Sequence, residues 1–279
     1  MLFALNRLRW YFRFPLKCTI IGLTVLLVCF PYPQRLIRHV QHIWNPNALI
    51  DPDAPGLQPL ADELRVRLTP DLTPRAALRT VERYVYEKVP YDWDWNTWGT
   101  ADYLPTVEEV IGMGREDCDG RAVLAASLLR HFGFRAHLVS DLAHLWVMTD
   151  VGEAMGPGKT KAVVATDKGV RFNASALREL PKAAAYGIAV FPLGRELIVV
   201  AVVWLLMLRQ YGGVLCGLAG GAMLLVGLGF IRAGSKEYLQ PTLWMQWVAV
   251  VSWIAGLAIL LLWASRNARR AERARLCVA

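Results

Sequence analysis

Cysteine and charged side chains are both scarce in this chain. Five of its 279 residues are cysteines, and 19% are Asp, Glu, Lys or Arg. Cys118 is the only cysteine between residues 34 and 185, so that segment can form no disulfide within itself. Hydrophobic residues make up 55% of the chain and its mean hydropathy is +0.31. This average is too apolar for an ordinary water-soluble enzyme.

The apolar residues are concentrated toward the two ends of the chain. Residues 14–32 come close to the roughly 20 residues that cross a bilayer core. Residues 212–231 and 243–264 are two further spans, and residues 186–208 form a fourth that contains Arg195 and Glu196. These two charges either pair or line a polar cavity inside the membrane, or they lie at its surface. The sequence therefore predicts about four transmembrane helices.

The net charge of +8 is carried by basic residues beside the outer spans. They are Arg7, Arg9, Arg13 and Lys17 before the first span, and Arg266, Arg269, Arg270, Arg273 and Arg275 after the last. This placement is typical of cytoplasmic flanks of membrane helices and argues against a nucleic-acid partner. No small-residue cleavage site follows the first run, so we expect an uncleaved anchor.

These patterns divide the chain into four parts. Residues 1–33 are a basic cytoplasmic N-terminus with its anchor, and residues 34–185 are a globular domain. Residues 186–265 are the C-terminal transmembrane helices, and residues 266–279 are a basic cytoplasmic tail. Four spans place both termini in the cytoplasm. We therefore expect a multi-pass protein of a bacterial inner membrane, with its globular domain facing the periplasm.

Cys118 stands directly before a predicted helix. Residues 120–131 are rich in small apolar side chains, and Gly133 ends the helix. A helix N-terminus favours an anion, which should lower the pKa of the thiol. The carboxylates of Glu116, Asp117 and Asp119 oppose that effect, so a nearby imidazolium is expected. The sequence predicts a reactive thiol rather than a buried structural one.

The helix is followed by a predicted antiparallel sheet with strands at residues 134–140, 143–149, 161–166 and 170–173, which makes the domain α+β. His144 lies on the second strand, and Asp167 ends a third strand that can pair with it. Cys118, His144 and Asp167 thus form a candidate triad for nucleophilic cysteine chemistry. His137 is the competing base. Asp150 is the competing acid, but it lies six residues along the same strand as His144.

Three segments together resemble the bacterial transglutaminase-like cysteine hydrolases. They are DYLPTVEEVIGMGREDCDGRAVLAASLLRHFGFRAHLVS, AHLWVMT and VVATDKG, and the resemblance covers residues 73–173. It implies a papain/transglutaminase-like domain in which Cys118 is the nucleophile, His144 the base and Asp167 the acid that orients it. Arg115-Glu116 departs from the glycine usual before Asp117, and residues 150–160 lengthen the spacing between histidine and aspartate.

The resemblance implies a membrane-anchored cysteine peptidase or acyl transferase, acting on peptide or amide bonds of an extracytoplasmic protein or peptide. Relatives often hold an aromatic side chain near the thiol, for which Tyr91, Trp93, Trp95 and Trp98 are candidates. Some relatives bind calcium beside the cysteine, which Asp117 and Asp119 could also do here; the same acids can simply cap the helix. We expect no cofactor and no metal. The alternative is a non-catalytic, membrane-anchored binding or scaffold module with the same fold.

Overall fold

The computed structural model describes residues 9–156, 161–166, 169–208 and 214–276. The chain forms two compact units. One is Cys29–Pro181, and the other combines the described parts of residues 1–28 and 182–279. The first unit holds all the strands that the structure describes, and the second consists of long apolar helices.

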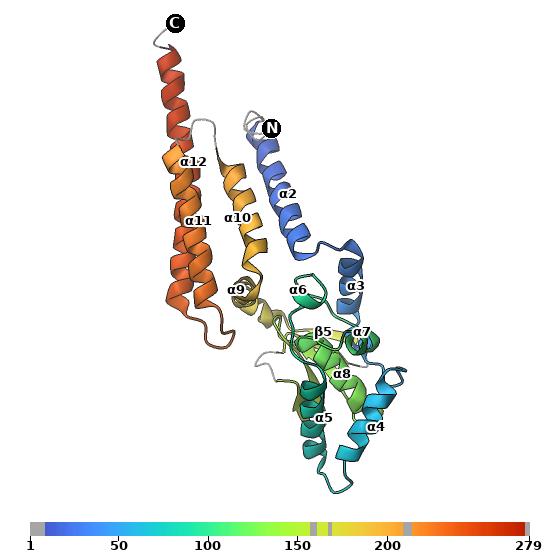
Figure 1. Cartoon of the computed structure of the whole chain (residues 1–279). Helices are drawn as coiled ribbons and strands as arrows, with labels where there is room; N and C mark the ends of the chain where they lie inside the picture. The colour runs from blue at the N-terminus through green and yellow to red at the C-terminus, as the bar shows by residue number, and fades with distance from the viewer. Residues whose placement is uncertain (1–8, 157–160, 167–168, 209–213, 277–279) are drawn as a thin grey trace. The chain divides into compact units, whose positions relative to one another are not determined.

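The first unit places its helices before its sheet in the sequence (Figure 1). The helices are α3 (Pro33–Trp44), the 3-10 turn η1 (Pro46–Leu49), α4 (Leu57–Arg67), α5 (Pro74–Lys88), α6 (Asp94–Thr97), α7 (Val107–Met113) and α8 (Cys118–His131). Two of these helices begin with a side-chain cap. Thr73 caps α5 by accepting a bond from the backbone of Ala76, and Thr106 and Glu109 form a complete capping box at α7.

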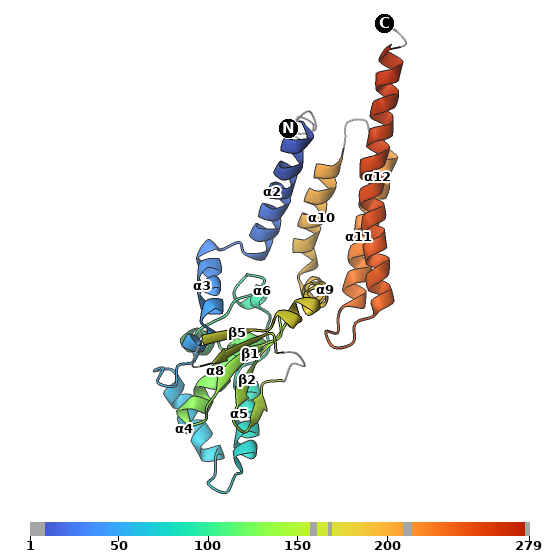
Figure 2. The ribbon, with the colours of Figure 1, turned by 180° about the vertical axis from the view of Figure 1, so that it is seen from behind.

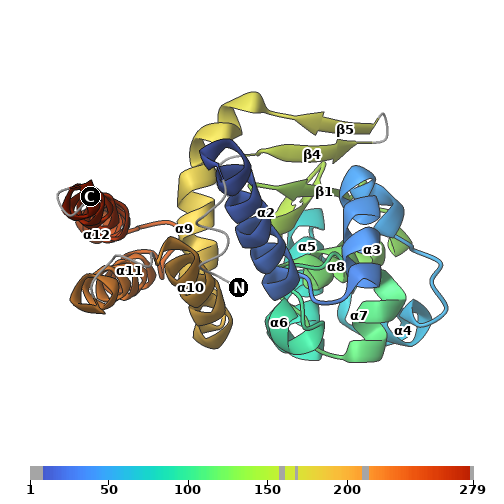
Figure 3. The same ribbon diagram turned by 90° about the horizontal axis from the view of Figure 1, so that it is seen from above.

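The sheet has five strands in the order β3-β2-β1-β4-β5, and every neighbouring pair is antiparallel (Figures 2 and 3). The strands are β1 (His137–Ser140), β2 (Leu145–Thr149), β3 (Gly152–Ala154), β4 (Val163–Thr166) and β5 (Gly169–Phe172), followed by the 3-10 helix η2 (Ala174–Glu179). Helices with an antiparallel sheet confirm the predicted α+β class. The sequence did not predict β3.

Helix α8 forms the centre of this unit. It packs against α5 and α7 on one side and against β1 and β2 on the other. Every residue from Ala122 to Leu129 is buried. Alanines at three of these positions let the neighbouring elements approach closely, as the small-residue pattern predicted. The N-terminus of α8, where Cys118 lies, is therefore fixed by its packing on both sides.

The second unit contains α2 (Trp10–Cys29), α9 (Leu180–Val190), α10 (Leu193–Met207), α11 (Val214–Gly234) and α12 (Leu243–Leu276). Three helical segments, Tyr11–Cys29, Val214–Gly234 and Leu243–Leu261, are long and apolar enough to cross a membrane. Helices α11 and α12 lie side by side (Figure 1). A Cβ atom on Gly227 would stand 2.3 Å from the ring of Trp253, so this contact requires glycine.

The predicted span at residues 186–208 is a bent pair of helices. The segments Ala174–Val190 and Leu193–Met207 meet at an angle of 112°. The described residues therefore hold three candidate spans, or four if the pair counts as one. Arg232 of α11 donates to the backbone carbonyl oxygens of Ile188 at 3.1 Å and Phe191 at 2.7 Å, beside the bend. It also pairs with the carboxylate of Glu196. Glu196 thus has a charged partner on another helix.

Candidate active site

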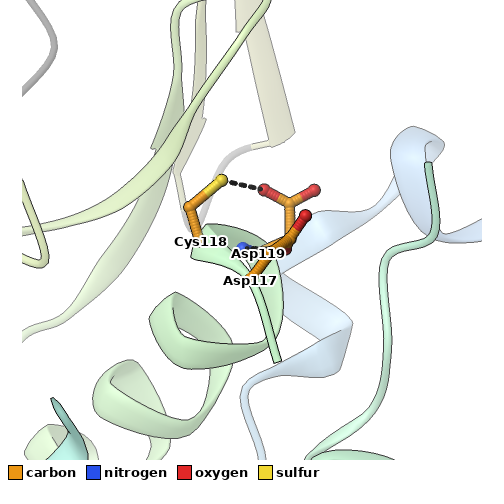
Figure 4. A group of neighbouring side chains, drawn as sticks. All are labelled: Asp117, Cys118 and Asp119. Atoms are coloured by element: carbon orange, nitrogen blue, oxygen red, sulfur yellow. Dashed lines mark hydrogen bonds between the residues drawn. The ribbon is translucent and has the colours of Figure 1, made fainter. Parts of the chain in front are cut away.

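Cys118 is the first residue of α8, directly after its N-cap residue Asp117. The Asp117 carboxylate accepts a hydrogen bond from the backbone N–H of Asp119 at 2.9 Å, which closes the first turn. The Cys118 thiol donates to Asp119 Oδ1 at 3.4 Å, as Figure 4 shows. The thiol therefore points toward a carboxylate and lies at the helix start that the sequence predicted.

The surroundings of Cys118 favour the neutral thiol. Burial raises its pKa well above the ordinary value, and the negative charges of Asp119 and Asp117 raise it further. The backbone of Leu145 acts in the opposite direction as a hydrogen-bond partner of the sulfur. The prediction of a lowered thiol pKa is therefore wrong. Desolvation and two adjacent carboxylates outweigh the helix N-terminus, whose favourable effect on an anion is about 0.3–1 kcal/mol at an exposed site.

His144 lies immediately before β2 and is half-buried. The residue after it, Leu145, is the backbone partner of the Cys118 sulfur, so the thiol lies against the start of this strand. Asp141 positions the turn that carries His144, because its Oδ1 accepts from the backbone N–H groups of Ala143 at 3.0 Å and His144 at 2.9 Å. Burial lowers the pKa of His144, and the charge of Asp141 partly offsets this. The sequence predicts a turn at Asp141 and Leu142, a position where aspartate is common, but not the effect of the Asp141 charge on His144.

Asp167 lies outside the described residues. The strand before it, β4, pairs with β1. The predicted pairing was with the strand that follows His144, which is β2. Val163 lies beside Ser140, which in turn pairs with Leu145, so β4 runs away from the His144 end of the sheet toward Thr166. The strand that pairs with the other edge of β2 is β3. The competing acid Asp150 is exposed and follows the far end of β2.

Three buried carboxyl groups meet beneath the Cys118 turn. One oxygen atom from each of Asp94, Glu116 and Asp117 lies within 4.8 Å of the others. Burial raises the pKa of Glu116 to about 8 and that of Asp117 to about 7, and it raises the pKa of Asp94 as well. The charge of Asp117 adds to the shifts of Glu116 and Asp94, and the charge of Asp102 adds to that of Asp117. Asp94 Oδ2 accepts from the backbone N–H of Tyr103, whereas Oδ1 has no hydrogen-bond partner among the described residues. The cluster therefore favours bound protons.

The carboxylate oxygens around Cys118 are also the kind of ligand that binds a hard cation. Asp94, Glu116 and Asp117 form one set of closely spaced donors, and Asp117, Cys118 and Asp119 form a second. Carboxylate oxygens suit calcium, whereas a thiol does not. The set built on Asp94 and Glu116 is thus the better match, and it extends beyond the Asp117 and Asp119 pair identified from the sequence.

Trp98 serves a structural purpose at this site. Its indole N–H donates to the Glu116 carboxylate, and its ring is buried. The indole N–H is therefore occupied by the carboxyl cluster. Tyr91 and Trp93 meet edge to face, and Trp93 stacks on Trp95 at a centroid distance of 4.6 Å. The Arg121 guanidinium lies over the Tyr91 ring at 5.1 Å, which places a cation one turn from Asp117.

Replacing Asp94 with asparagine is expected to stabilise the domain. The folded domain binds the Asp94 proton more tightly than the unfolded chain does, so this stability is lost as pH rises above the ordinary aspartate pKa of 3.8. An asparagine amide at the Oδ1 position can donate to Glu116 or Asp117 while the other oxygen keeps its bond from Tyr103. We expect a gain of about 1–2 kcal/mol at neutral pH, growing toward alkaline pH.

Thermal unfolding of the full chain at pH 5, 7 and 9 measures this gain. The exposed Asp53→Asn is the matched control, since it makes the same chemical change outside the cluster. A gain that is independent of pH would contradict the assignment of the proton to the cluster. A loss of stability that appears only with added calcium would show that the carboxylates bind a cation instead.

The region that contains this site matches a known family. Residues 59–165 match the family described as the Transglutaminase-like superfamily. This part of the chain is similar to transglutaminase-like domains. The matched residues include Cys118 and His144 and end before Asp167. No curated protein sequence matches the chain. The transglutaminase-like domain and the apolar helices together agree with the fold and the membrane anchoring that the sequence predicted.

Proposed function

We propose that the protein is a membrane-anchored cysteine acyl transferase of the transglutaminase-like type, acting on peptide or amide bonds. One observation carries the proposal. Within the matched domain, Cys118 opens the buried helix α8, and α8 packs against β2, the strand that His144 immediately precedes. A thiol at a helix start and a histidine on a strand packed against that helix supply the nucleophile and base of cysteine catalysis.

In the proposed reaction, Cys118 Sγ attacks the carbonyl carbon of the substrate while its proton passes to the His144 imidazole. The protonated imidazole then gives this proton to the leaving nitrogen, the amide bond breaks and a thioester remains. Water or an amine attacks the thioester carbon next, and His144 accepts a proton from it. The C–S bond then breaks, and the imidazolium returns the proton to Cys118 Sγ, which restores the free thiol. The backbone N–H of Cys118, at the start of α8, is the proposed donor to the oxyanion.

The raised thiol pKa and the lowered imidazole pKa make the resting pair neutral. A neutral imidazole can accept a proton, so His144 acts as a general base during attack instead of holding a preformed thiolate. The alternative, a non-catalytic binding module, draws its support from the same raised thiol pKa. The presence of both a cysteine at the start of α8 and a histidine at the start of β2 favours the enzyme, because a binding surface has no need of that pair.

The proposed location is a bacterial inner membrane with the transglutaminase-like domain on the periplasmic side. Basic residues beside the outer spans support this orientation through the positive-inside bias. The proposed substrate is therefore a protein or peptide outside the cytoplasm. The reaction is hydrolysis when water attacks the thioester and crosslinking when an amine does.

Casein with a biotin-labelled primary amine tests the activity of the full chain. Biotin on casein would indicate amine transfer, whereas ammonia release or new peptide termini without biotin would indicate hydrolysis. The same assay tests the third member of the proposed triad. We expect Asp167→Asn to lower turnover strongly and Asp150→Asn to leave it unchanged.

Asp141→Asn is the informative comparison, because Asp141 is the described carboxylate whose charge acts on His144. Asparagine keeps the Oδ1 acceptor for Ala143 and His144, so the turn is preserved while the charge is lost. Normal turnover in Asp167→Asn together with low turnover in Asp141→Asn would overturn the assignment of Asp167. The Cys118–His144 pair would be unaffected by that result.

A further inference from the structure

Helix α3 turns its polar side chains toward the transglutaminase-like domain. His39 is buried, and its Nε2 lies 3.7 Å from Asp102 Oδ2. His42 Nδ1 lies 2.5 Å from the carbonyl oxygen of Leu104. On the same side, Arg35 donates to the carbonyl of Trp98 and Arg38 pairs with Glu109 at 2.8 Å. The domain therefore holds α3 through hydrogen bonds and charge.

The opposite side of α3 is apolar and exposed. Its residues form the α3 stripe: Ile37 (58% exposed), Val40 (45%), Ile43 (49%) and Trp44 (79%). Positions separated by three, six and seven residues share one helix face. An amphipathic helix of a water-soluble domain normally buries its apolar face. Here the two faces are reversed, so the α3 stripe needs an apolar partner outside the domain.

The position of α3 in the chain identifies that partner. Helix α2, which is long and apolar enough to cross a membrane, ends at Cys29, and α3 begins at Pro33. The four Cα–Cα steps from Cys29 to Pro33 reach at most about 14 Å. The start of α3 therefore lies within that distance of the end of α2. Tyr32 and Trp44, which flank α3, are the residue types that favour the membrane–water interface.

We propose that the α3 stripe inserts into the interfacial layer of the bilayer that α2 enters. The helix would lie along the membrane surface, with its basic and imidazole side chains bound to the domain and its apolar side chains among the lipids. This second attachment fixes the orientation of the domain against the membrane. The inference stands on α3 alone and does not depend on catalysis.

A second copy of the chain fits the α3 stripe less well. The stripe comprises four side chains on one helix of 12 residues. A stable protein interface buries about 800 Å² on each partner, which is more than such a stripe offers. A lipid surface needs no complementary shape, and it is already present wherever α2 is inserted.

Fluorescence quenching by lipids tests the proposal. The full chain, with its native cysteines replaced, receives a single cysteine at Val40 or at Val66 and an environment-sensitive label on it. Val66 is 82% exposed on α4 and gives a matched valine outside α3. In nanodiscs whose phospholipids carry a shallow nitroxide, the label at position 40 should be quenched several-fold more than the label at position 66.

Equal quenching at the two positions would overturn the proposal. Self-quenching between copies labelled at position 40 would overturn it as well, by placing a second copy on the stripe. Each labelled protein must keep the melting temperature of the wild type. A photoreactive phospholipid provides a second measurement without any substitution: adducts within residues 36–44 of the wild-type chain are expected, and adducts confined to the long apolar helices would contradict the proposal.

Discussion

Replacing Cys118 with alanine is expected to abolish acyl transfer, and replacing His144 with alanine to reduce it by about 10²–10⁴-fold. Both effects follow from the neutral resting pair. Burial and the charges of Asp119 and Asp117 keep the thiol protonated, so attack requires a base that removes the proton as the bond forms. Without His144 the proton has no acceptor at the start of β2, and the carboxylates continue to oppose formation of the thiolate.

The pH dependence of turnover checks this mechanism. Burial lowers the pKa of His144 below its ordinary value of 6.5, so turnover should rise with pH through a midpoint below 6.5 as the imidazole becomes neutral. His137→Ala is the matched control and should keep both rate and profile, because His137 lies on β1 rather than before β2. A His144→Ala variant with normal turnover would contradict the role of the base. Normal turnover in Cys118→Ala would contradict the proposed function itself.

Replacing Arg232 with alanine is expected to destabilise the helical unit by about 3–5 kcal/mol, the cost of removing one partner from a buried ion pair. The bend between α9 and α10 leaves backbone carbonyl oxygens without helical partners. Arg232 donates to two of them, on Ile188 and Phe191, and also pairs with Glu196. Removing the guanidinium would leave these acceptors unpaired in an apolar environment.

Thermal unfolding in detergent, followed by the protease sensitivity of α10, measures the loss. Arg232→Lys separates charge from geometry, since an ammonium group keeps the positive charge but not the planar fork that serves several acceptors. We expect this variant to fall between the wild type and Arg232→Ala. Lys236→Ala is the control, because Lys236 is an exposed basic residue just beyond the same helix. Equal stability of Arg232→Ala and Lys236→Ala would mean that the bend does not depend on the arginine.

Local features of the chain were predictable because they depend on neighbouring residues. The capping box at Thr106 and Glu109, the cap at Thr73 and the small-residue helix α8 are each specified within a few positions. The start of α8 at Cys118 follows from the same logic. Strand pairing was harder to predict from the sequence. Strand β3 has only three residues, and β4 follows β3 in the sequence but pairs with β1.

The electrostatics of the site could not be predicted, because they arise from segments that are distant in sequence. Asp94 lies on α6 and meets Glu116 and Asp117 only in the folded domain. Burial of Cys118, with the charges of Asp119 and Asp117, reverses the sign of the shift that a helix N-terminus alone would give to the pKa of this thiol. The orientation of α3, with its polar face toward the domain, also depends on segments that are distant in sequence. Its apolar pattern is visible in the sequence, but the partners of its polar face, Glu109 and Leu104, come from later segments.

The protonated state of Cys118 also affects the chemical lifetime of the protein. Peroxides and small disulfides react with thiolates far faster than with thiols, so a raised pKa slows formation of sulfenic acid and of mixed disulfides. The segment from 34 to 185 holds no second cysteine that could return an oxidised Cys118 to the thiol by exchange. The carboxylates around the helix start thus preserve this single sulfur between encounters with substrate, at the expense of its intrinsic reactivity.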